Sequence, residues 1–225
     1  MIRLWENDRV RRYMGDRIYR TKVNLYLGVG VNFLYIFIKF FTGIAFRSEW
    51  LIVFALYYAV LTGLRVALVN YVRRREVKHD LAAEYRRYRL TGALLVPMNL
   101  VLTIIIARMI AFQESYDYPG VLIYGMAAYV FYALILAMVN VVRFRKEGSP
   151  VISAIKTVNL TAALVALLSL EAAMLARFGA GDDTLFRARM LGSSGLGVCA
   201  LILGMSGYMI IRATRKLKTE AMPDE

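Results

Sequence analysis

Apolar residues in this 225-residue chain come in long blocks, not in the short alternation of a soluble domain. Two such blocks, 23–46 and 50–72, are separated by the polar link Arg47-Ser48-Glu49. About 20 mostly apolar residues cross the hydrocarbon core of a bilayer as a helix, so each block predicts one transmembrane helix. The complete set of predicted spans is 23–46, 50–72, 90–112, 120–142, 152–176 and 190–211.

This pattern predicts an all-α polytopic membrane protein in which six transmembrane helices form three tandem helical hairpins. Each hairpin is two spans joined by a short link. The predicted hairpins are 23–72, 90–142 and 151–211. The predicted domain plan is a basic N-terminal segment 1–22, a transmembrane domain 23–212 that includes the loop 73–89, and a tail 213–225.

The loop 73–89 predicts a short surface helix, because its apolar residues recur at helical spacing as Leu81, Tyr85 and Tyr88. Acidic residues recur every four residues in the same segment, near His79, the only histidine. We interpret this acidic row as a solvated, salt-bridged helix face and not as a metal site. Its members are Glu76, Asp80 and Glu84. The stretch 216–225 is expected to be a disordered tail.

The net charge of +13 is explained by topology. Most Lys and Arg residues lie in the N-terminal segment, the two even loops and the C-terminal tail. The opposite loops hold only Arg47, Arg177, Arg187 and Arg189. Cytoplasmic segments near membrane ends collect Lys and Arg, so we expect a multi-pass protein of the cell membrane with both termini cytoplasmic. The basic face favours anionic lipid headgroups and needs no nucleic-acid partner.

Polar and charged residues inside the predicted spans are the candidate site. A Lys at the centre of an isolated span costs about 2.5–3.5 kcal/mol on insertion scales, so such residues face protein, water or the interface. Snorkelling to the surface is the alternative for Lys39 and Arg65. The candidate substrate-binding residues are Asn32, Tyr35, Lys39, Tyr58, Thr62, Arg65, Asn99, Tyr129, Tyr132, Asn159 and Glu171.

An internal sequence repeat supports this selection of candidate substrate-binding residues. Each odd span carries an Asn eight to ten residues after its start, and a charged residue follows at similar depth towards the outside. Spans two and four also leave the membrane through closely similar sequences, 67–73 and 137–143. The Asn residues are Asn32, Asn99 and Asn159, and the charged residues are Lys39, Arg108 and Glu171. The repeat predicts a polar site between three related hairpins; the alternative is that the Asn residues only join helices by hydrogen bonds.

Two resemblances follow from these residues. Val31-Asn32, Lys39, Gly43 and Ser48 resemble the first helix and turn of cation diffusion facilitators, which also have six spans and cytoplasmic termini. That family binds divalent metal through His or Asp in its second span, where this chain has Tyr57 and Leu61, so we expect no metal site. The chain as a whole resembles a family of small uncharacterised six-span bacterial membrane proteins. The stretches 118–129 and 212–214 carry this second likeness.

The composition disfavours an enzyme. One histidine, in a loop, excludes an intramembrane Ser-His-acid triad, and the single Cys199 excludes dithiol chemistry. No cofactor motif occurs. The first hypothesis is therefore a small transporter or channel for a small polar, anionic or amphipathic solute, with Glu171 paired to Lys39 or Arg108 or carrying a proton. The alternative is a non-catalytic membrane scaffold or regulatory subunit, in a homo-oligomer or with a membrane protein partner.

Overall fold

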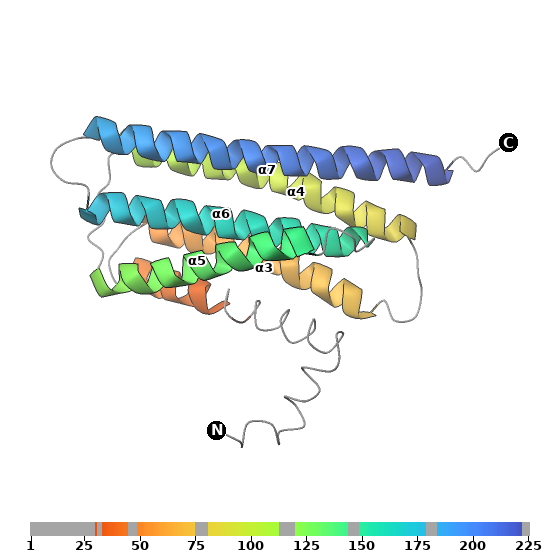
Figure 1. The fold of residues 1–225 in the computed structure, drawn as a ribbon, viewed down its shortest axis with the longest axis horizontal. Helices are drawn as coiled ribbons and strands as arrows, with labels where there is room; N and C mark the ends of the chain where they lie inside the picture. The colour runs from red at the N-terminus through yellow and green to blue at the C-terminus, as the bar shows by residue number, and fades with distance from the viewer. Residues whose placement is uncertain are drawn as a thin grey trace, which may run out of the picture. The chain divides into compact units, whose positions relative to one another are not determined.

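The structure, a computed structural model, describes residues 30, 33–44, 49–74, 81–112, 120–143, 149–178 and 184–221. Apart from Ser149, all these residues are α-helical (Figure 1). Five of the described helices are long and apolar enough to cross a membrane, and the helix Phe33–Ile44 is a shorter apolar one. The protein is thus all-α and has the helices of a multi-pass membrane protein. It divides into two compact units, with the boundary between Val69 and Asn70.

In the first unit, the helix Phe33–Ile44 packs against α3 (Glu49–Arg74). Two contacts fix how the helices align. Lys39 lies against Phe54, and Tyr35 lies against Tyr58. A step of four residues back along the first helix matches a step of four residues forward along α3, so the two helices are antiparallel. Within the described part of the predicted hairpin 23–72, the helix Phe33–Ile44 and α3 thus pack as an antiparallel pair.

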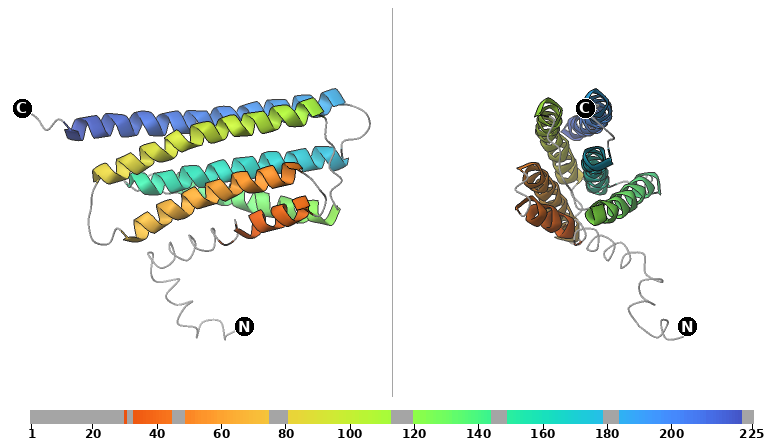
Figure 2. Two further views of the ribbon diagram at one scale, coloured as in Figure 1. Left: turned by 180° about the vertical axis from the view of Figure 1, so that it is seen from behind. Right: turned by 90° about the vertical axis from the view of Figure 1, so that its left-hand side faces the viewer.

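The second unit is built from four long helices: α4 (Leu81–Phe112), α5 (Gly120–Arg143), α6 (Pro150–Phe178) and α7 (Thr184–Ala221). α4 packs along α7, α5 packs on α6, and α6 also contacts both α4 and α7. The end-on view in Figure 2 shows α6 between α5 and the α4–α7 pair. Fifteen residues of α6 are buried, with alanines prominent among them, so α6 is the centre of this unit.

α4 and α7 approach closely because glycines face the neighbouring helix at two places. A Cβ on Gly92 would lie 3.0 Å from the Met209 Cβ and 3.0 Å from the Ser206 carbonyl oxygen. A Cβ on Gly195 of α7 would lie 3.0 Å from two side-chain carbons of Ile106. In these pairs, a higher residue number on α4 always goes with a lower one on α7, so the two helices run antiparallel in a constant register. Small residues allow this close approach between membrane helices.

The packing differs from the predicted hairpins in the second unit. Among the described residues α4 and α5 make no direct contact; the main partner of α4 is α7, far along the sequence. α4 and α5, neighbours in the chain, are thus not packing partners, whereas the neighbouring pairs α5–α6 and α6–α7 do pack together.

Two of the expected loop segments are helical. α4 begins at Leu81, so the expected separate surface helix is the first part of the transmembrane helix. α7 continues to Ala221, so the stretch 216–221 is helical and not a disordered tail. The interpretation of Glu84 as a solvated residue is also wrong, because its side chain is fully buried. α4 extends beyond its apolar run because buried side chains such as Glu84 and Tyr88 continue its packed face.

The remaining predicted spans agree closely with α3, α5 and α6. The predictions for the segment 1–22, for Asn32 and for the outer turns fall outside the described residues. The side of the membrane on which the termini lie stays a prediction.

Candidate functional site

A buried lysine enclosed by aromatic rings is the most distinctive polar feature of the first unit. Lys39 is only 2% exposed. Its Nζ lies 5.2 Å from the centre of the Tyr35 ring and 5.3 Å from the centre of the Phe54 ring. Tyr58 meets Tyr35 edge to face at 5.1 Å between ring centres, and both tyrosines are buried. Cation–π contacts of this kind stabilise an ammonium group away from water.

The aromatic site continues as a polar face along α3. Thr62 and Arg65 are both buried, and they follow Tyr58 at steps of four and three residues. Such steps place them on the same side of the helix as Phe54 and Tyr58. At a rise of 1.5 Å per residue, Arg65 lies about 16 Å along the helix from the level of Phe54 and Lys39. The hairpin therefore holds two buried cations at different depths with hydroxyl groups between them.

The hairpin segments 33–44 and 50–69 contain two charged residues, Lys39 and Arg65, and α3 begins at Glu49. The cationic charge at Lys39 is met by the faces of aromatic rings, which attract a cation without cancelling its charge. Two buried basic side chains on one helix pair are a feature that favours a nearby anion.

The candidate residues of the second unit do not gather in one place. Ser149, just before α6, donates a hydrogen bond to Glu84 of α4. Counting along both helices from this contact puts Asn99 level with Leu164 and Asn159 level with Leu94. The two Asn residues therefore differ in depth by about five residues, or about 7.5 Å along the helices. Asn99 is buried, whereas Asn159, Tyr129 and Glu171 are half-buried. Tyr132 is 60% exposed and points to the surface of α5.

Both Asn residues keep a buried side-chain oxygen that accepts no hydrogen bond from the described part of the chain. The nearby Thr103 hydroxyl bonds instead to the Asn99 backbone carbonyl at 2.9 Å. Interhelical hydrogen bonding through these two amide oxygens is therefore absent within the described helices, which removes one reason for regarding them simply as packing residues.

A polar junction that sequence reasoning missed joins α4, α6 and α7 at one end. The Ser149 hydroxyl donates to Glu84 Oε2 at 2.8 Å, just before Pro150 opens α6. Tyr88, also buried, lies near the side chains of Ser153 and Arg212. The carboxylate at the start of α6 complements the positive end of that helix. The Ser-Pro helix start was the sequence signal for this junction, but nothing in the sequence identified its partner on α4.

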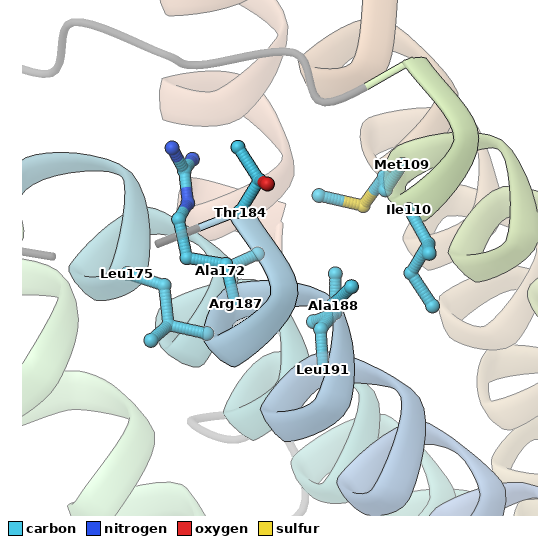
Figure 3. Close-up of a pocket in the computed structure, with 8 residues that line it drawn as sticks. All are labelled: Met109, Ile110, Ala172, Leu175, Thr184, Arg187, Ala188 and Leu191. Atoms are coloured by element: carbon cyan, nitrogen blue, oxygen red, sulfur yellow. The ribbon is translucent and has the colours of Figure 1, made fainter. Parts of the chain in front are cut away.

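At the opposite end of the same helices lies a small pocket of about 40 Å³ (Figure 3). Its lining is mostly apolar, and Thr184 and Arg187 of α7 are its polar members; Figure 3 shows their side chains on the same side of the pocket. A cavity needs roughly 10–15 Å³ to hold one water molecule, so this pocket has room for a few waters and for no larger solute. The other lining residues are Met109, Ile110, Ala172, Leu175, Ala188 and Leu191.

Two further observations bear on the site. Phe54 was missed by sequence reasoning, although its position four residues before Tyr58 on α3 was a usable signal. In the described ranges no group of three or more His, Cys, Asp and Glu side chains is close enough to hold a metal ion. Tyr57 and Leu61, at the positions of the metal ligands in cation diffusion facilitators, are both buried.

Comparison with known proteins gives no family assignment: no family model, curated protein or solved structure matches this chain.

Proposed function

We propose that this protein is an integral membrane transporter for a small anionic or amphipathic solute, with Lys39 of the first hairpin as the residue that binds the negative charge. The observation that carries the proposal is the burial of Lys39 between Tyr35 and Phe54. Ionisable residues within membrane helices are costly and are commonly functional.

The charge and side chains of the hairpin support an anion over a cation. Lys39 and Arg65 are two buried basic residues of one helix pair. A passing anion would meet Arg65, the hydroxyl groups of Thr62 and Tyr58, and then Lys39. The aromatic rings beside Lys39 are equally suited to the apolar part of an amphipathic solute.

The test is uptake by proteoliposomes that contain the purified protein. Radiolabelled phosphate, sulfate and succinate serve as the probes, each measured against empty liposomes. We expect uptake of at least one probe by the wild type. Lys39→Met should reduce that uptake about tenfold or more, because a hydrogen bond to a charged group contributes about 1.5–3 kcal/mol.

Two matched variants make the result specific. Lys39→Arg keeps the charge and should retain part of the uptake. Arg108→Gln removes an exposed cation from α4 and should leave uptake near the wild-type level. Uptake no better than that of empty liposomes, or full uptake by Lys39→Met, would overturn the proposal.

A second candidate, a non-catalytic scaffold or regulatory subunit, is favoured by the second unit. Its α4–α7 seam is closed at Gly92 and Gly195, and the pocket at its end admits only a few waters. Stoichiometric recovery of one membrane protein after crosslinking in native membranes, together with no solute uptake, would favour this role over transport.

A further inference from the structure

Two basic stretches far apart in the sequence are brought to the same end of the second unit. α4 begins with exposed arginines, and the antiparallel α7 ends with exposed lysines and arginines. We call this surface the basic end. Its residues are Arg86, Arg87 and Arg89 of α4, and Arg212, Arg215, Lys216 and Lys218 of α7.

The register of the helix pair places like charges at matching levels. Gly92 lies against Met209 and Ile106 against Gly195, so Arg89 is level with Arg212 and Arg86 with Arg215. Like charges at matching levels of adjacent helices repel, and anions bound beside them reduce this repulsion. Glu84, on the same stretch of α4, is fully buried and accepts a hydrogen bond from Ser149.

The basic end also lies where the apolar part of both helices stops. Leu90 on α4 and Ile211 on α7 are exposed and apolar, and each adjoins an exposed arginine. One turn inside this boundary Tyr208 is exposed, and its hydroxyl lies 3.4 Å from Nη1 of Arg212. Tyrosine and arginine in this order are typical of the headgroup layer of a bilayer.

From this arrangement we propose that the basic end binds the phosphate groups of anionic phospholipids. The cations of α4 and α7 together form one surface. Lipid phosphates bound there offset the repulsion between these cations. Arg87 lies at one side of this basic surface, where its guanidinium group stacks 3.9 Å from the ring centre of Tyr71. This inference is independent of Lys39 and of transport.

The test is thermal unfolding of the full-length protein in a neutral detergent, titrated with phosphatidylglycerol, phosphatidylcholine or inorganic phosphate. Phosphatidylglycerol should raise the melting temperature and the other two should not, and 0.5 M NaCl should weaken the effect through screening, since the Debye length there is only about 4 Å. An equal effect of phosphatidylcholine or of free phosphate would overturn the proposal.

The double variant Arg215→Gln/Lys218→Gln should bind phosphatidylglycerol roughly 30-fold more weakly, as expected for two lost cations at an anionic surface. The matched control, Arg177→Gln/Arg189→Gln, removes two exposed cations from the other end of α6 and α7. It should keep wild-type affinity. Equal losses in both variants, or no loss in the first, would contradict the assignment. All four positions are exposed, and size-exclusion profiles matching the wild type confirm that the variants are folded.

Discussion

The first hairpin and the α4–α7 pair are both antiparallel helix pairs, yet they are closed by opposite means. In the hairpin, large side chains fill the seam: Tyr35, Phe54 and Tyr58 surround the ammonium group of Lys39. α4 and α7 instead come close together because Gly92 and Gly195 have no side chain to separate the helices. A seam of rotatable polar side chains can rearrange around a solute, whereas a glycine seam brings two backbones together and resists change.

The largest effect is expected at the glycine seam. Gly92→Leu would force side-chain atoms into the Met209 Cβ and the Ser206 carbonyl, and the backbone there cannot yield cheaply. We expect a loss of about 3 kcal/mol in unfolding free energy, the upper part of the usual range for overpacking. Unfolding in mixed micelles with increasing SDS measures this loss.

The control for this variant is Gly204→Leu on α7, where an added Cβ would meet nothing within 4 Å. Its stability should stay within about 0.5 kcal/mol of the wild type, as is usual for surface substitutions. Equal destabilisation by both variants would show that the close approach of α4 and α7 is not what makes Gly92 necessary.

A smaller effect is expected in the hairpin. Phe54→Leu keeps an apolar side chain but removes one of the two rings that face the Lys39 ammonium, so it should cost about 1–2 kcal/mol. Phe40→Leu makes the same exchange at an exposed position of the helix Phe33–Ile44 and should change stability little. If the two variants were equal in unfolding free energy, the rings would not be stabilising the lysine.

The comparison also shows how far sequence reasoning reached. Apolar blocks predicted α3, α5 and α6 within a few residues, because the ends of those helices coincide with the ends of the apolar runs. The apolar blocks did not predict the full length of α4 and α7, because both helices continue into charged sequence. There, Arg, Lys, Glu and Ala favour helix, and buried positions such as Tyr88 and Ala213 extend the packed stripe.

Helix partners were harder to predict than helices. The sequence placed Tyr35, Lys39, Tyr58, Thr62 and Arg65 on consistent faces, because a helical period fixes which residues share a side. It could not show that α4 pairs with α7 instead of α5. That choice depends on the three-dimensional fit of Gly92 to α7, and a lone glycine does not reveal which helix it meets.

The most direct test of the central claim is whether the buried position of Lys39 becomes accessible to water and anions while the protein works. In a Cys199→Ser background, Lys39→Cys is reconstituted into liposomes and exposed to membrane-impermeant thiol reagents of either charge. Only a thiolate in contact with water reacts. The account predicts reaction at Lys39→Cys, faster with the anionic reagent because Arg65 lies on the same helix pair. Phe41→Cys, on the exposed apolar face of the helix Phe33–Ile44, should stay unlabelled. Labelling of Lys39→Cys no faster than that of Phe41→Cys would contradict the account.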